Sequence, residues 1–240
     1  MEEQSYTSTH PLGHTGPVKG SLYFNCDVRE VLFLSFARLA DIINKATQNQ
    51  QYCTAAILDV SQAFDKVWHP GLLFQIKRIL PSIYLNLPKS YLNARHFDTK
   101  INGETSNRFH IHSGVPQGSI LSPLLYILYT SDLPTSRETT LGTFVDDTAI
   151  FATREDPTIA SLNLQEHLYS IEKWLKKWKI KVNESKSSQI TFTLRKGHCP
   201  AVNINRNIIP QTEVVKYPGL HFDCRLNWKE HIAKKENKST

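Results

Sequence analysis

Two adjacent aspartates, Asp146 and Asp147, stand inside TFVDDTAIF, a stretch whose other residues are typical of β-strands. Two half-buried carboxylates repel each other, so one must take up a proton unless a cation lies nearby. A divalent metal ion would remove that cost, and two such ions can hold the attacking and leaving oxygens of a phosphoryl transfer. A tight turn would also accept both residues, because Asp tolerates left-handed backbone and bonds to its own backbone. On these residues alone both interpretations stay open.

A metal site of this kind needs a further carboxylate from elsewhere in the chain. Asp59 is the candidate, because it lies at the end of the apolar run CTAAILDV (53–60), which predicts a buried strand. Taken singly, Asp59 fits a helix cap or a surface acid better than a metal ligand. SGVPQGSILSP (113–123) combines two glycines and two prolines with Gln117. Small residues let a ligand or another backbone approach closely, although an ordinary Gly/Pro loop would have the same composition.

The elements that must position these residues mix helices and strands without regular βαβ alternation. Apolar residues recur near the 3.6-residue period over 28–48 and 158–178, which predicts two amphipathic helices. The segment 122–133 predicts a buried helix with Ser122 as its N-cap. We therefore expect an antiparallel α+β fold. The remaining expected elements are helices over 70–80 and up to about 93, a hairpin around 103–107, and strands at 188–194, 202–204, 207–209 and 213–222.

The charge balance and the cysteines narrow the class of protein. Lys and Arg number 28 against 22 Asp and Glu, a net charge of +6, which favours a polyanionic partner such as nucleic acid but also fits an ordinary basic surface. The four cysteines form no CxxC pair, which argues against zinc and predicts reduced thiols in an intracellular protein, in the nucleus or cytoplasm. The first twenty residues contain no apolar signal, and the longest apolar stretch is shorter than the roughly 20 residues of a membrane span, so we expect neither secretion nor a membrane partner.

Several segments together carry a resemblance to a known family. LDVSQAFDKVWH, SGVPQGSILSPLLYILYTSDLP and FVDDTAIFA resemble, in order and spacing, the palm motifs of reverse transcriptases, particularly those of jockey-type non-LTR retrotransposons. KWKIKVNESKS and VVKYPGLHFD extend the resemblance over about residues 50–235. The family implies an α+β fold, a reverse-transcriptase-type palm with an antiparallel sheet flanked by helices. The segment before residue 50 does not resemble the family's fingers, so we expect a truncated copy with fingers largely missing and an incomplete thumb.

The resemblance also implies a reaction and a metal. Asp59, Asp146 and Asp147 would be the catalytic residues and the ligands of two Mg²⁺ ions, with Mn²⁺ as a possible substitute. The reaction would be RNA-directed DNA polymerisation, in which a primer 3′-hydroxyl attacks the α-phosphate of a dNTP. The partners would be an RNA template, a DNA primer and dNTPs.

Further substrate-binding residues follow from the same motifs. Phe64 stands where the family places a bulky ring that excludes a ribose 2′-hydroxyl, although a core aromatic would fit equally well. Val60 and Ser61 would offer backbone groups near the triphosphate, and Gln117 and Gly118 would line the nascent base pair. Lys186 would lie near the triphosphate; its alternative is a solvent-exposed lysine. The segment YPGLHFD would form the hairpin that supports the primer end, with Pro218 where the family usually has leucine.

Two other functions stay open at this point. The chain could be a catalytically inactive nucleic-acid-binding remnant of a retrotransposon, with the lysine-rich segment 173–181 contacting phosphates. It could also be a two-metal nuclease, which would explain the acids but would leave SGVPQGS and Phe64 without a role. The expected organisation is a disordered segment 1–20, a reverse transcriptase domain 21–235 with partial fingers and palm, and a basic tail 236–240.

Overall fold

The structure is a computed structural model that describes residues 28–144, 147–217 and 220–226. The segments 1–20 and 236–240, together with Asp146 and Pro218, lie outside the described residues. The chain divides into two compact units. The inserted unit comprises Phe64–Ser131 among the described residues, and the sheet unit contains the described residues on either side of it.

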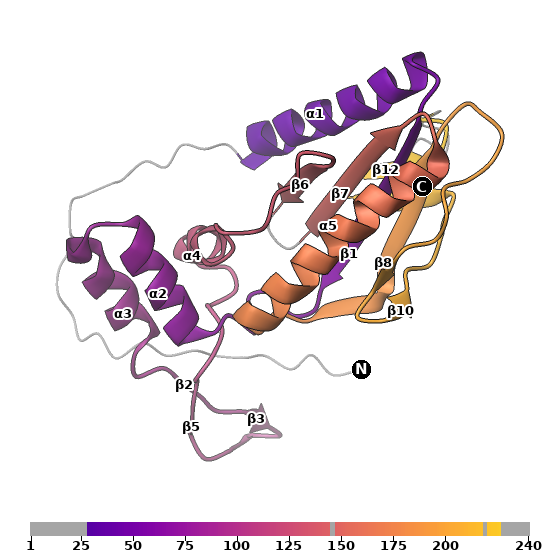
Figure 1. The fold of residues 1–240 in the computed structure, drawn as a ribbon. Helices are drawn as coiled ribbons and strands as arrows, with labels where there is room; N and C mark the ends of the chain where they lie inside the picture. Colours follow the sequence, from indigo (N-terminus) through magenta and orange to yellow (C-terminus); the bar gives the residue numbers. More distant parts are fainter. Residues whose placement is uncertain (1–27, 145–146, 218–219, 227–240) are drawn as a thin grey trace. The chain divides into compact units, whose positions relative to one another are not determined.

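The sheet unit is built around an antiparallel sheet of four strands in the order β6-β7-β1-β8 (Figure 1). Its strands are β1 (Tyr52–Val60), β6 (Thr140–Phe144), β7 (Asp147–Arg154) and β8 (Val182–Phe192). Central strand β1 is buried from Tyr52 to Leu58, which confirms the strand predicted from its apolar run. Strand β8 begins earlier than the predicted 188–194, because Val182 and Asn183 already pair with Val60 and Asp59 of β1.

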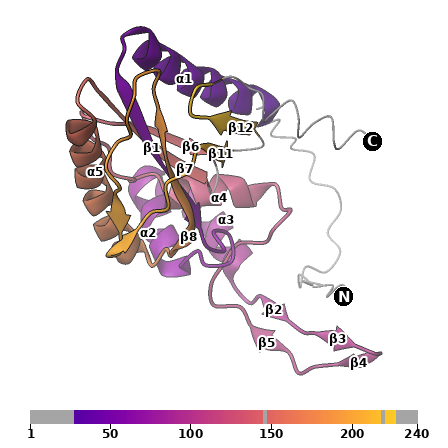
Figure 2. The ribbon, with the colours of Figure 1, turned by 90° about the vertical axis from the view of Figure 1, so that its right-hand side faces the viewer.

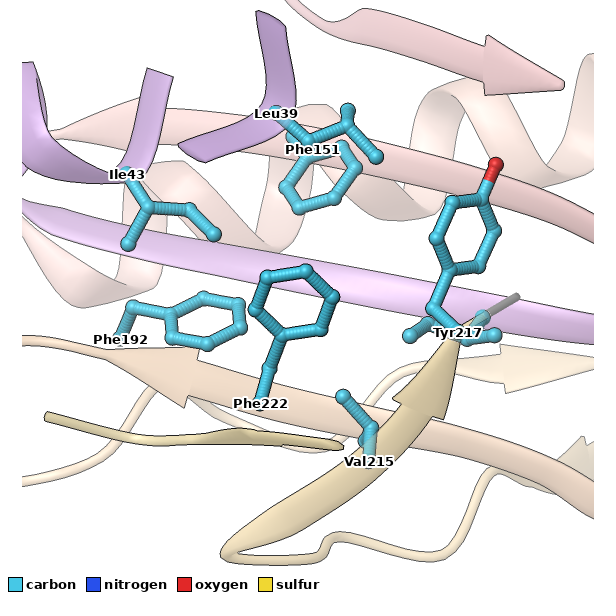
Figure 3. A pocket seen from close by; sticks show the side chains of 8 residues that line it. Leu39, Ile43, Phe151, Phe192, Val215, Tyr217 and Phe222 are labelled. Atoms are coloured by element: carbon cyan, nitrogen blue, oxygen red, sulfur yellow. The ribbon is translucent and has the colours of Figure 1, made fainter. Parts of the chain in front are cut away.

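One face of the sheet carries α1 (Val28–Gln48) and the hairpin of β11 (Val214–Tyr217) and β12 (Leu220–Asp223) (Figure 2). Apolar side chains from these elements meet those of the sheet around a small space of about 10 Å³, room for no more than one water molecule (Figure 3). It is lined by Leu39, Ile43, Ile57, Phe151, Phe192, Val215, Tyr217 and Phe222. This space is therefore part of the core and not a ligand site.

Helix α5 (Pro157–Trp178) packs on β1 and β7 with the apolar side chains that its periodicity predicted, among them Leu164, Leu168 and Ile171. The helix begins where the Asp156 carboxylate accepts hydrogen bonds from the backbone N–H groups of residues 158 and 159. A short hairpin of β9 (Asn203–Ile204) and β10 (Asn207–Ile208) completes the described part of the sheet unit.

The inserted unit contains short helices and a two-stranded arm. Its elements are α2 (His69–Ile79), the 3₁₀-helix η1 (Ser82–Leu85), α3 (Asn86–Leu92), β2 (His96–Phe97), β3 (Lys100–Ile101), β4 (Glu104–Thr105), β5 (Phe109–His110) and α4 (Leu121–Tyr129). The predicted Ser122 cap is wrong. Helix α4 begins at Leu121 after Ile120, and the Ser122 hydroxyl donates to the Pro116 carbonyl instead.

The antiparallel sheet with flanking helices confirms the predicted α+β fold. None of the helices in the described ranges combines the length and the apolar composition needed to cross a bilayer.

Candidate active site

Asp59 and Asp147 are direct partners across the antiparallel pair of β1 and β7. Directly opposed residues point to the same face of a sheet, with Cβ atoms about 4.5–5.5 Å apart. Both residues are half-buried. The structure thus brings together two carboxylates that are distant in the sequence, and their repulsion favours a bound cation.

The register of β1 follows from the apolar residues that precede Asp59. Ile57 pairs with Ala149, and both are buried against the core beneath α1. A slip of one residue would turn this apolar row to the opposite face of the sheet, so burial fixes the register. Asp59 and Asp147 continue the same row by one step, which places the acids where the core ends. Asp146, the third predicted ligand, lies outside the described residues.

Tyr217 of β11 belongs to the core beneath α1 and lies near enough to Asp147 to feel its charge. Its side chain is buried, and burial first, then the negative charge of Asp147, raises the pKa of its hydroxyl. Gly142 of β6 makes room for this ring: a Cβ at that position would stand 3.6 Å from the Tyr217 oxygen and 3.1 Å from Leu39 Cδ2. The sequence analysis placed Tyr217 in the hairpin motif but did not predict that it lies near Asp147.

An irregular segment of β8 adjoins Asp59 on its other side. The pairing of β1 with β8 shifts from Ile57–Ser188 to Asp59–Asn183, which leaves residues 184–187 as a bulge. The Asp59 backbone N–H donates to Ser187 Oγ at 3.1 Å, and this hydroxyl donates to the Asn183 carbonyl at 2.8 Å. The bulge is therefore bonded to the backbone of the acid itself.

Lys186 belongs to this bulge. Its backbone N–H donates to Asn183 Oδ1 at 3.3 Å, and its side chain is exposed. The structure thus places Lys186 beside Asp59 in the same sheet and leaves its ammonium group accessible. Strand pairing continues beyond Asp59, because Val60 pairs with Val182 and the Ser61 N–H donates to the Lys181 carbonyl at 2.9 Å. The Ser61 N–H is thereby occupied, whereas the predicted role of this residue relied on backbone groups.

The other predicted residues, Phe64, Gln117 and Gly118, belong to the inserted unit. The Val115 N–H donates to the Phe64 carbonyl at 2.8 Å, and Gln117 Nε2 lies 3.1 Å from both carboxylate oxygens of Asp65. A carboxylate only accepts, so the nitrogen of the Gln117 amide must face Asp65. The Phe64 ring packs against Tyr126 with centroids 5.3 Å apart and is half-buried. Two loops, 64–69 and 113–118, thus hold each other.

Gly114 lets these two loops approach. Its φ is +88°, and a Cβ there would lie 2.7 Å from the Asp65 carbonyl oxygen, closer than any real contact. Its own carbonyl oxygen accepts a hydrogen bond from His69 Nε2 at 2.7 Å. Gly118 has a φ of +77° but open space around it. The first glycine of the SGVPQG motif is therefore required for steric reasons, because a side chain at Gly114 would collide with Asp65.

The described residues contain no group of three or more His, Cys, Asp or Glu side chains arranged around a common point for a metal. Asp59 and Asp147 nevertheless supply the hard oxygen atoms that Mg²⁺ prefers, and they are opposed in register. The carboxylate oxygens of these two residues are therefore chemically suited to bind a divalent cation.

Comparisons with known proteins agree with the fold and the motifs. Residues 24–222 match the family model described as reverse transcriptase (RNA-dependent DNA polymerase). Over 204 residues the chain is 36% identical to the RNA-directed DNA polymerase from the Drosophila melanogaster mobile element jockey, covering 82% of this chain and 22% of that protein. Over 238 residues it is 34% identical to the probable RNA-directed DNA polymerase from the transposon X-element of the same species, covering 97% of this chain and 25% of that protein. The chain thus spans about a quarter of these relatives' length.

Solved telomerase structures share the fold. Apo telomerase from Candida tropicalis, truncated from its C-terminal domain, aligns with a TM-score of 0.55 and 17% identity over 84% of this chain and 44% of that chain. Telomerase of the same species in complex with a TWJ fragment of telomeric RNA aligns with a TM-score of 0.51 and 13% identity over 87% and 38% of the two chains. The resemblance seen in the palm motifs is confirmed, and the chain belongs to the reverse transcriptase family, with relatives among jockey-type mobile elements.

Proposed function

We propose that this chain carries the nucleotidyl-transfer site of an RNA-directed DNA polymerase from a mobile element. The observation that carries the proposal is the pairing of Asp59 with Asp147 at the end of a buried sheet, in a chain of the reverse transcriptase family. A primer 3′-hydroxyl oxygen would form a bond to the α-phosphorus of a dNTP. The bond from that phosphorus to the bridging oxygen would break, pyrophosphate would leave, and the hydroxyl proton would pass to solvent.

Asp59, Asp147 and Asp146 would hold two Mg²⁺ ions, or Mn²⁺, because carboxylates are the ligands that such hard cations take. When bound, the ions would neutralise the phosphate charge and stabilise the attacking and leaving oxygens. The protein's own contribution is position. The apolar row ending at Ile57 and Ala149 fixes where the carboxylates stand. The bulge bonded to Asp59 carries Lys186, whose exposed ammonium group would contact the negative charge of a triphosphate.

The partners proposed are an RNA template, a DNA primer and dNTPs. A net charge of +6 supports a polyanionic partner, and one structural neighbour is a telomerase bound to a fragment of telomeric RNA. Phe64 would exclude ribonucleotides and Gln117 and Gly118 would line the base pair. The described cysteines, Cys53, Cys199 and Cys224, are free thiols, which supports the proposed intracellular location.

Primer extension tests the proposal. The purified chain should extend a labelled DNA primer on an RNA template when Mg²⁺ and dNTPs are present. Asp147→Asn keeps the size of the side chain and removes its charge, so extension should fall by roughly 10³-fold. Asp41→Asn is the matched control, because Asp41 is an exposed acid on α1 whose partner is Lys45, and its extension should equal that of the wild type.

Three results would count against the proposal. Equal extension by the wild type and Asp147→Asn would remove the carboxylate from the reaction. Salt-sensitive RNA binding without any extension would favour the inactive binding remnant. Cleavage of a labelled duplex in the absence of dNTPs would favour a nuclease.

A further inference from the structure

An arm of the inserted unit, residues 95–112, gathers aromatic rings on very short strands. Strand β2 pairs with β5 in the register His96–His110 and Phe97–Phe109, and β3 with β4 forms the tip (Figure 2). We call this segment the aromatic arm. Its aromatic residues are His96, Phe97, Phe109, His110 and His112.

The rings form cross-strand pairs on opposite faces of the arm. The centroids of His96 and His110 lie 4.0 Å apart, and those of Phe97 and Phe109 lie 5.7 Å apart. Successive residues of a strand point to opposite faces, so one face carries imidazoles and the other carries phenyl rings. His112 extends the imidazole face, because its ring stacks on His110 at 6.1 Å.

These rings are not part of a core. Phe97 is 39% exposed and Phe109 is 53% exposed, and every residue from 100 to 110 is exposed. Cross-strand aromatic pairs do stabilise a hairpin, but β-branched residues stabilise one as well without presenting a flat ring to solvent. The choice of phenyl rings therefore points to a ligand with flat faces of its own.

The charges on the arm favour a polyanion. The arm contains the cations Arg95, Lys100 and Arg108 and the acids Asp98 and Glu104. Lys100 is exposed, and the Arg108 side chain remains 67% exposed although Nε lies 3.9 Å from Asp98 Oδ2. Exposed guanidinium and ammonium groups beside aromatic rings are the combination that binds single-stranded nucleic acid, with bases on the rings and phosphates near the cations.

We propose that the aromatic arm binds a single-stranded segment of nucleic acid by stacking unpaired bases on Phe97 and Phe109. A duplex keeps its base faces covered by neighbouring pairs, so the arm discriminates in favour of single strands. The inference rests on the proposed function only in its choice of nucleic acid as partner; it needs neither catalysis nor a metal.

The test measures binding without the reaction. The full chain is titrated with a fluorescein-labelled 20-nucleotide oligouridylate, and separately with a duplex of the same length, in EDTA and without dNTPs. The double variant Phe97→Val/Phe109→Val retains strand-forming residues and removes the rings, so its Kd for the single strand should rise at least about tenfold. Its Kd for the duplex should stay within twofold of the wild type.

Controls separate stacking from loss of fold. Phe97→Tyr/Phe109→Tyr retains the ring faces and should bind like the wild type. Phe74→Val removes an exposed phenyl ring from α2 in the same unit and should leave binding unchanged. A single strand that contains 2-aminopurine reports stacking directly, because a stacked base loses fluorescence, and this loss should be smaller with the valine double variant.

Two outcomes would overturn the inference. One is a single-strand Kd of the valine double variant within twofold of the wild type. The other is equal weakening for single strand and duplex, which would mean that the rings act only through the structure of the arm. Because the binding test contains neither dNTPs nor free metal ions, a chain without polymerase activity can still pass it, and an active polymerase can still fail it.

Discussion

The two groups of candidate site residues are held in different ways. Asp59 and Asp147 are set by strands whose pairing extends over Tyr52–Asp59 and whose core residues are almost wholly buried. Gln117 and Gly118 belong to the loop 113–118, which is held by a few single contacts with the loop 64–69. Many ladder hydrogen bonds together fix the position of a strand pair, whereas the position of the loop depends on each of its few contacts.

This difference predicts which substitutions should affect the reaction and which should affect the fold. In the sheet unit a change of side chain chemistry at Asp59 or Asp147 should alter the reaction and leave the fold in place, since opposed like charges oppose folding. In the inserted unit, even a substitution that touches no substrate should displace the loop 113–118. Three measurements examine this contrast, beginning with the greatest expected effect on stability.

Gly114→Ala should have the greatest effect. The new Cβ would meet the Asp65 carbonyl oxygen at 2.7 Å in a backbone conformation of positive φ, so the loops must separate. We expect the free energy of unfolding to fall by about 3 kcal/mol. Chemical denaturation measures it, and Gly118→Ala is the control, because its φ is also positive but no atom lies within 4 Å. The control should lose about 1 kcal/mol. Equal losses would mean that the close approach of the loops contributes nothing.

His167→Leu tests whether the sheet relies on contacts outside its own ladder. His167 is a buried residue of α5. Its Nδ1 lies 2.6 Å from Thr139 Oγ1 and its Nε2 lies 2.9 Å from the Pro134 carbonyl oxygen, and both partners belong to the segment that precedes β6. A carbonyl only accepts, so Nε2 carries the proton and Nδ1 accepts from the threonine. Removing the ring leaves both groups without these partners and should cost about 2 kcal/mol. If strand pairing alone positions β6, primer extension per folded molecule should stay within twofold of the wild type. A larger fall would show that the ladder is not sufficient.

The pKa of the Cys53 thiol depends on how completely water is excluded from the centre of the sheet. Burial raises the pKa of Cys53 from 9.0 to about 12. As the pH rises, the unfolded chain therefore loses the Cys53 proton before the folded protein does. The contribution of the protonated thiol to the free energy of unfolding is complete below about pH 9 and is lost as the pH approaches 12. Each pH unit in that window should cost about 1.4 kcal/mol. Denaturation of the wild type and Cys53→Ala at pH 8 to about 10.5 measures the difference, and equal slopes for the two proteins would contradict it.

The sequence predicted those parts of the fold that depend on local pattern. The strand over 53–60 was predicted from its continuous apolar run, and the helices over 28–48 and 158–178 were predicted from apolar periodicity. The meeting of Asp59 with the acidic pair could be inferred from the family motifs and from the need to offset their charge. Strand pairing confirms it for Asp147.

Other features depend on partners that are far away in the sequence. The bulge at 184–187 is held by the Ser187 hydroxyl, which accepts from the Asp59 N–H and donates to the Asn183 carbonyl, and no local pattern in NESKS indicates it. The bond between Gln117 and Asp65 likewise joins two motifs that the sequence treats separately. The Ser122 cap failed for a local reason instead, because the Ser122 hydroxyl donates to the Pro116 carbonyl in the loop just before α4.

The position of β1 in the sheet has a consequence for synthesis on the ribosome. Its two neighbours, β7 and β8, are both made after the whole inserted unit, and the contact between Asp59 and Ser187 spans 128 residues. At roughly 5–20 residues per second, the nascent chain waits several seconds before this apolar strand can find either neighbour. During that interval its unpaired edges are open to association with other nascent chains, so slower translation should favour aggregation or chaperone capture.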